Sequence, residues 1–258
     1  MTSMTTGIAV GDTFASPFHP IGDLLGVFAA HRSVLEQVGA TGIVAAGLLT
    51  TPVALGAVRT ELQWSRIVAV TDLDAVGAET VITRVANRDS EIEVDRHVRL
   101  LDEAGNTREE GVETWIAPRT AAAGDGPGAD FCTVRWGEAL RESLSKDGTF
   151  ADSLANWDGT IGLRCIDGPS HAREVHLRIY RGRIVDVTRR TPNGATFTFI
   201  TTAERWVELA SAERSDFMRR AIAGEFSSSG DGYEYLRLTK PLGTIIEHAR
   251  IIAKESHA

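Results

Sequence analysis

The chain has 258 residues, 43% of them hydrophobic and 24% charged, which is typical of a globular protein with room for one large domain or two ordinary ones. Its formal net charge of −8 argues against a nucleic-acid-binding surface, because phosphate contacts need concentrated Lys and Arg. Two cysteines, Cys132 and Cys165, are too few for a disulfide framework or a zinc site. The N-terminus lacks the basic stretch and apolar run of a signal peptide, so we expect a cytoplasmic protein.

Two helices are predicted near the start of the chain. Large apolar residues recur at helical spacing between Pro20 and Gly39, which predicts a helix over residues 21–37. Residues 40–59 then read ATGIVAAGLLTTPVALGAVR, with a single charge at the end, and this pattern predicts a helix buried on every face. Pro52 and the glycines argue against a membrane span. We therefore expect a central helix wrapped by a curved antiparallel sheet.

Strand patterns complete the first half. Residues 92–100 carry apolar side chains at even positions, namely Ile92, Val94, Val98 and Leu100. His97 falls on the polar face of this strand and is expected to be exposed. Residues 103–107 (EAGNT) predict a hairpin turn, because they tolerate positive φ. Further strands are predicted over residues 66–73, 79–86 and 110–117, which makes this half α+β.

Residues 118–130 (PRTAAAGDGPGAD) have no periodicity and predict a linker. The second half then predicts a helix, four or five antiparallel strands and three more helices, a second α+β domain. The predicted strands cover residues 158–166, 174–180, 184–188 and 196–200, and the predicted helices cover residues 135–146, 203–210, 215–224 and 232–254. The last helix carries an apolar stripe wide enough to close a core or line a cavity.

Three segments of the first half resemble the MaoC-like hotdog family, which is related to hydratases that add water to enoyl thioesters. They are residues 10–14 (VGDTF), residues 41–49 (TGIVAAGLL) and residues 94–111, which contain LLDEAGN. The resemblance implies a hotdog domain over residues 8–118. Family hydratases carry an Asp and a His about five residues apart, and this chain has no such pair in residues 30–41, so plain hydration is not expected.

The second half resembles the sterol carrier protein family, which binds lipids and fatty acyl thioesters in an apolar tunnel. The matching segments are residues 159–166, 181–183 (RGR), 197–203 (FTFITTA) and 217–224 (FMRRAIAG). The resemblance implies a sterol-carrier-like α+β domain over residues 131–258, joined to the hotdog domain by a linker over residues 119–130.

Candidate site residues can each be read in two ways. His19 and Asp23 lie four residues apart and form either an acid–base pair or a turn and a helix start. His31 and Arg32 either bind a carboxylate or phosphate of an acyl carrier or are solvated helix charges. Four aromatic residues could line the apolar tunnel that the resemblance implies for the second half, namely Trp206, Phe226, Tyr233 and Tyr235. Packing in a hydrophobic core explains these residues equally well.

The resemblances imply an enzyme of the lyase, dehydratase or cyclase type on a bulky hydrophobic substrate, thioester-linked or polyketide-like. Its catalytic residues would be His19, Asp23 and His31. The alternative is a non-catalytic lipid- or acyl-binding protein, or the partner subunit of a catalytic hotdog protein. Hotdog domains usually dimerise, so a homodimer or heterodimer is expected. No metal, cofactor, nucleic acid or membrane span is expected, since the sequence has no phosphate loop or dinucleotide fingerprint.

Overall fold

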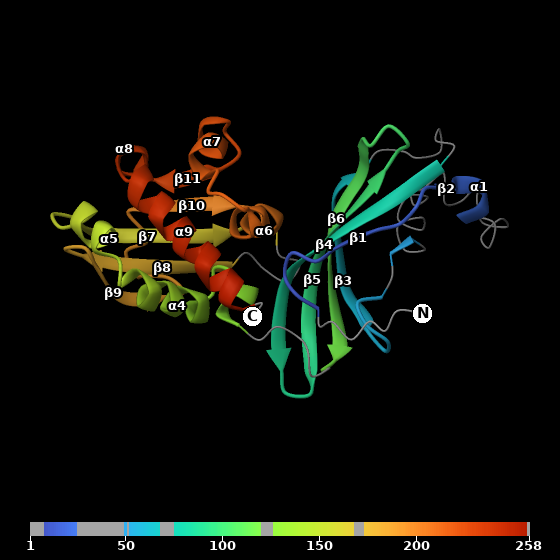
Figure 1. The fold of residues 1–258 in the computed structure, drawn as a ribbon, viewed down its shortest axis with the longest axis horizontal. Helices are drawn as coiled ribbons and strands as arrows, with labels where there is room; N and C mark the ends of the chain where they lie inside the picture. The colour runs from blue at the N-terminus through green and yellow to red at the C-terminus, as the bar shows by residue number, and fades with distance from the viewer. Residues whose placement is uncertain are drawn as a thin grey trace. The chain divides into compact units, whose positions relative to one another are not determined.

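The computed structural model of the chain describes residues 8–24, 49–50, 52–67, 75–119, 126–167 and 173–256. The chain forms two compact units, Met1–Ala123 and Gly124–Ala258 (Figure 1). Each unit contains one β-sheet with helices, so the α+β class predicted from the sequence is confirmed.

The sheet of the first unit is antiparallel throughout, in the order β1-β4-β5-β6-β3, with β2 pairing on β4. Its strands are β1 (Thr13–Ala15), β2 (His19–Pro20), β3 (Val58–Ile67), β4 (Ala75–Arg88), β5 (Glu91–Leu101) and β6 (Thr107–Pro118). A short helix, α1 (Ile21–Leu24), follows β2. The strands predicted over residues 79–86, 92–100 and 110–117 lie within β4, β5 and β6, and the predicted hairpin turn joins the last two.

The second part of the helix predicted over residues 40–59 is not helical. The chain turns after Pro52, which cannot continue a helix, and Gly56 adopts a left-handed φ of +82° before β3 begins. Leu55 is fully exposed and Val58 is 63% exposed, so this part is not buried on every face. Residues 40–48 lie outside the described residues, as do residues 25–37 of the first predicted helix and residues 68–73 of the first predicted strand.

The second unit has a five-stranded sheet in the order β11-β10-β7-β8-β9. Its strands are β7 (Asp158–Cys165), β8 (Arg173–Tyr180), β9 (Arg183–Thr188), β10 (Phe197–Thr201) and β11 (Ser227–Gly230). All the strand predictions of this half are confirmed in position, but the expectation of a purely antiparallel sheet was wrong. Strand β10 runs parallel to β7, and β11, a segment for which no strand was predicted, pairs with β10.

The helices of the second unit are η2 (Pro127–Ala129), α4 (Val134–Leu144), α5 (Gly148–Ser153), α6 (Ala203–Ser211), α7 (Phe217–Ile222), α8 (Gly232–Arg237) and α9 (Thr239–Glu255). The single helix predicted over residues 232–254 is therefore two helices that meet at Leu238. Helix α9 packs beside α4 and α6, and α4 lies on β8 and β9 (Figure 1). No helix in the described parts of the chain is long and apolar enough to cross a bilayer.

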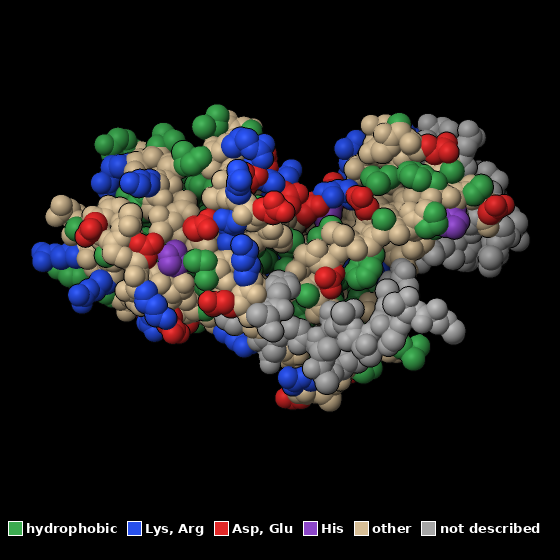
Figure 2. Space-filling model, viewed as in Figure 1, with side chains coloured by type: hydrophobic (Ala, Val, Ile, Leu, Met, Phe, Trp, Pro, Cys, Tyr) green, Lys and Arg blue, Asp and Glu red, His purple; other side chains and the backbone are tan. Residues whose placement is uncertain are grey.

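The surface of the second unit carries charges of both signs. Figure 2 shows Lys and Arg side chains interspersed with Asp and Glu over the face in view. Many of these charges form close ion pairs, such as Arg220 with Asp216 and Glu208.

Candidate functional site

A cavity of about 190 Å³ lies in the first unit. Its walls come from β1, β4 and β5 and from the segment that precedes β3, and they are mostly apolar, with Phe14, Leu49 and Ile82 among them. The polar lining residues are Ser16, Thr50, Thr80 and Arg96. The cavity therefore offers an apolar space with hydroxyl groups and one guanidinium on its wall.

The strand register explains why these side chains meet. Ala78, Thr80 and Ile82 alternate along β4, so all three point to the same face of the sheet. Ile82 is directly opposite Arg96 on β5, and Thr80 is opposite Phe14 on β1. Because opposite residues of an antiparallel pair share a face, the register places Arg96 on the apolar face.

Arg96 is 3% exposed and is held in place by two neighbours on β6. Its Nε donates to Glu113 Oε2 at 3.0 Å, and its guanidinium lies 4.9 Å from the centre of the Trp115 ring. Glu113 is 1% exposed and also accepts hydrogen bonds from Trp115 Nε1 and, at 3.3 Å, from Arg59 Nη1. Burial lowers the pKa of Arg96, and Glu113 opposes that effect. An arginine nevertheless stays charged in proteins.

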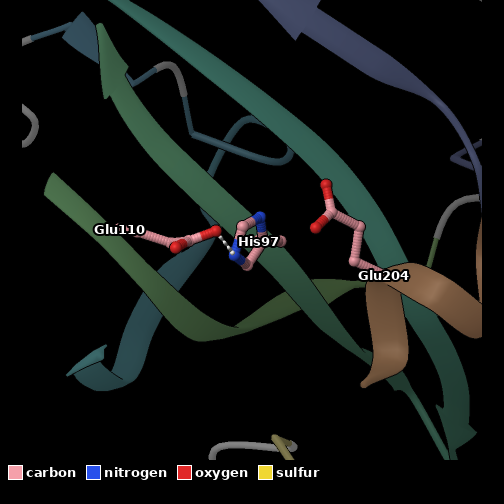
Figure 3. A group of neighbouring side chains, drawn as sticks. All are labelled: His97, Glu110 and Glu204. Carbon is pink, nitrogen blue, oxygen red and sulfur yellow. Dashed lines mark ion pairs between the residues drawn. The ribbon is translucent and has the colours of Figure 1, made fainter. Parts of the chain in front are cut away.

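The opposite face of β5 carries His97, which was expected to be exposed and is in fact 5% exposed. The expectation was therefore wrong: β5 is an interior strand, between β4 and β6, and His97 has a charged neighbour on β6. His97 Nε2 lies 3.0 Å from Glu110 Oε1 (Figure 3). The same oxygen of Glu110 also accepts a hydrogen bond from Arg99 Nε at 3.3 Å. Glu204, the third side chain in that figure, belongs to the second unit.

Glu109 is a buried carboxyl group that the sequence analysis did not single out. It is 1% exposed, lies opposite Leu100 and Ile67, and has no hydrogen-bond partner for Oε2 among the described residues. Burial raises its pKa to about 7. The adjacent acidic residues Glu109 and Glu110 were a usable signal, because neighbours in a strand point to opposite faces and one of them must enter the apolar side.

The catalytic residues predicted from the sequence are not brought together in the described part of the chain. His19 lies half-buried in β2, Asp23 lies exposed in α1, and neither lines the cavity described above. No hydrogen bond or ion pair joins these two side chains in the parts of the chain that the structure describes. His31 and Arg32 lie outside the described residues, so their roles stay predictions.

The four aromatic residues predicted to bind a ligand lie in different surroundings. Trp206 is fully buried and packs on the rings of Phe131, Trp136 and Phe199 at 5.3–6.0 Å between centroids. Phe226 packs on Phe199 and Phe217, and Tyr235 packs on Phe197. Tyr233 is 73% exposed on α8. Their ring contacts are those of a packed core with one surface residue, and a ligand-binding role for them stays a prediction.

A chain of hydrogen bonds in the second unit joins Ser143, His248 and Asp147. Ser143 Oγ is 2.7 Å from His248 Nδ1, and His248 Nε2 is 3.0 Å from Asp147 Oδ2. Asp147 also accepts the backbone N–H groups of Thr149 and Phe150 as the N-cap of α5. The order of groups is that of a nucleophile, a base and an orienting acid, but the three residues also tie together α4, α9 and the start of α5. The second unit also has a more open pocket of about 910 Å³, which is lined by residues of α4, α5 and the start of β9, such as Glu142, Phe150 and Arg183.

The fold and the cavity together define a protein of two α+β units with a ligand-sized cavity in the first. Parts of it are similar to solved structures. A sterol carrier protein 2 structure is 14% identical, covers 48% of this chain and 99% of its own, with a TM-score of 0.42. The sterol carrier protein domain 2 of Helicoverpa armigera is 19% identical, covering 45% and 86%, with a TM-score of 0.32. A MaoC-like dehydratase from Rhodospirillum rubrum is 20% identical, covering 44% and 94%, with a TM-score of 0.33.

No protein-family profile matches the chain, and no curated protein sequence matches it. The likenesses to solved structures therefore describe a distant and partial resemblance in fold.

Proposed function

We propose that the first unit binds a small acyl compound, with the apolar part of the ligand inside the cavity. The observation that carries this proposal is the cavity itself, an apolar space of about 190 Å³ with polar groups on its wall. An apolar cavity of about 150 Å³ accommodates benzene, so this one has room for a ring or a chain of roughly six to eight carbons. The volume favours a smaller group than the bulky substrate expected from the sequence.

The polar lining supports binding as the function. Ser16, Thr50 and Thr80 contribute hydroxyl groups and Arg96 a guanidinium, groups that orient a carbonyl or carboxyl oxygen by hydrogen bonding. Part of this capacity is already used, since Ser16 Oγ accepts from the backbone N–H of Ala78 at 2.8 Å. A lyase, dehydratase or cyclase with His19, Asp23 and His31 as catalytic residues remains the alternative proposal, and the reacting group of its substrate would lie outside this cavity, because His19 and Asp23 do not line it.

The proposal is tested by calorimetric titration of the full chain with a six-carbon acid, its amide and its thioester. Ala78 is buried on the cavity wall, so Ala78→Leu should fill part of the space and weaken binding by at least about tenfold. Ala86→Leu is the matched control, because Ala86 is on the same strand but opposite Glu93, on the other face. If none of the three compounds binds the unaltered chain, or if both variants bind equally well, the proposal fails.

A further inference from the structure

We propose that the hydroxyl group of Thr50 recognises the ligand of this cavity by donating a hydrogen bond to its carbonyl oxygen. The inference rests on the function proposed above and deepens it, because it names the residue and the functional group on which recognition depends. Thr50 lines the cavity from the segment that precedes β3.

The side chain of Thr50 is buried without a hydrogen bond. The residue is 8% exposed, and its hydroxyl group has no partner in the parts of the chain that the structure describes. Buried polar groups are almost always hydrogen-bonded, so each exception needs an explanation. A hydroxyl group on the wall of a cavity can obtain its partner from the ligand, and this accounts for a threonine among apolar lining residues.

The other polar groups of the lining already have partners. Ser16 Oγ accepts a hydrogen bond from a backbone N–H of β4 at 2.8 Å, and Thr80 Oγ1 donates to a backbone oxygen of β1 at 3.5 Å. Arg96 Nε donates to a carboxylate of β6 at 3.0 Å. Among the described lining residues, Thr50 is therefore the one whose polar group is left for the ligand to satisfy.

The hydrogen-bonding groups that remain favour a carbonyl oxygen as their partner. The oxygen of Ser16 already accepts a hydrogen bond, so what this residue still offers the cavity is an O–H donor, as Thr50 also does. A carbonyl oxygen has two lone pairs and no hydrogen, so it can accept from one or both donors and leaves no donor of its own unsatisfied. An ammonium group brings three donors, more than the oxygen of one free hydroxyl group can accept.

The apolar lining suits the rest of such a ligand. Leu49, Pro52 and Val53 flank Thr50 in the chain, and Ile82, which is 1% exposed, contributes from β4. A carbonyl compound held at Thr50 therefore keeps its hydrocarbon part against apolar side chains, where burial contributes to binding.

The experiment compares hexan-2-one with 2-methylhex-1-ene, in which a CH₂ group replaces the carbonyl oxygen, by calorimetry on the full chain. The measured quantity is the ratio of the two affinities in each variant, because the difference in hydration between the two compounds is the same for every variant. Thr50→Val keeps the shape of the side chain and removes the hydroxyl group. It should weaken binding of the ketone relative to the alkene by about two- to tenfold, as expected for the loss of one hydrogen bond between neutral groups.

Control variants separate the lost donor from other effects. Thr50→Ser keeps a hydroxyl group and should keep the ratio, and Thr50→Ala is a second variant without the donor and should lower it. Thr60→Val is the matched control, because Thr60 is exposed on β3, bonds to a backbone oxygen of β6 and does not line the cavity. It should leave the ratio unchanged.

The outcomes distinguish this inference from the proposed function. An unchanged ratio in folded Thr50→Val or Thr50→Ala, or an equal fall in Thr60→Val, would overturn the role of Thr50 and leave the cavity function standing. The role of Thr50 would also be overturned if the ketone failed to bind a chain that binds the six-carbon acid, amide or thioester. If none of these compounds binds the unaltered chain, the proposed function itself is wrong.

Discussion

Glu109 offers a sharp test of the first unit, because its carboxyl group is buried and its pKa of about 7 lies in the accessible range. The perturbation is Glu109→Gln, which keeps the shape of the side chain and removes the charge. In the folded chain the protonated form is favoured, since ionisation would place a charge in the apolar face without a partner for Oε2 among the described residues. The variant should therefore be insensitive to the titration that the unaltered chain undergoes.

The sign and size of the effect follow from the two pKa values. A carboxyl group that titrates near 4.5 when unfolded and at about 7 when folded contributes its full stability below pH 4.5. That stability is lost as the pH rises from 4.5 through 7. At about 1.4 kcal/mol for each unit between the two values, the free energy of unfolding falls by about 3 kcal/mol across this range.

The measurement is urea unfolding of both proteins at pH 5 and pH 8, followed by tryptophan fluorescence. Trp64 and Trp115 report on the first unit. We expect the Gln variant to match the unaltered chain near pH 5 and to exceed its stability by up to about 3 kcal/mol at pH 8. Taking the difference between variant and parent removes contributions from other groups. A difference that is the same at both pH values would refute the assignment.

The control for this experiment is Glu110→Gln. Glu110 is the next residue along β6 and points to the other face, where His97 and Arg99 pair with it. Replacing Glu110 removes the carboxylate from these two ion pairs. The Glu110→Gln variant should therefore have a lower free energy of unfolding than the unaltered chain and should show no gain in stability at high pH.

Three further predictions concern other parts of the chain. Asp147→Asn should lower the free energy of unfolding of the second unit by about 1 kcal/mol in urea titrations, because Asp147 caps α5 and accepts from His248. The partners hold the pKa of Asp147 below its usual range, so this loss should shrink as the pH falls through that range. Gly111→Ala should destabilise the first unit by about 1–3 kcal/mol, since a Cβ there would lie 2.8 Å from a backbone oxygen and 3.0 Å from the Trp64 ring; unchanged thermal stability would contradict this. His19→Ala should leave the binding of the six-carbon acid unchanged, because His19 does not line the cavity, and a loss of affinity in calorimetry would contradict this.

The sequence predicted the long strands of both units well because alternation is a local signal. Ile92, Val94, Val98 and Leu100 are all fully buried, as their spacing indicated. Arg96 also occupies an even position of this strand, so the alternation places it on the apolar face. The alternation does not show, however, which other residue neutralises a charge buried there. Glu113 supplies that partner from a strand that is distant in sequence.

Other features depended on contacts that a local pattern does not encode. Serine and glycine in residues 227–230 suggest a loop, yet this segment forms β11 because β10 offers an unpaired edge to it. The parallel pairing of β10 with β7 follows from the route of the chain rather than from its residues. At Pro52 the sequence did contain the local signal. The apolar composition of residues 40–59 led to the prediction of a helix, although a proline inside such a segment indicates that the helix ends there.

The close packing of η2 against α9 determines where a fragment that contains only the second unit should begin and end. Gly128 donates its backbone N–H to Ser256 Oγ at 3.0 Å, and a Cβ on Gly128 would lie 2.7 Å from the backbone of Ala253. The first helix of this unit and the end of its last helix therefore hold each other in place. A recombinant fragment should start before residue 126 and extend through Ser256, since removing either end would remove the packing partner of the other.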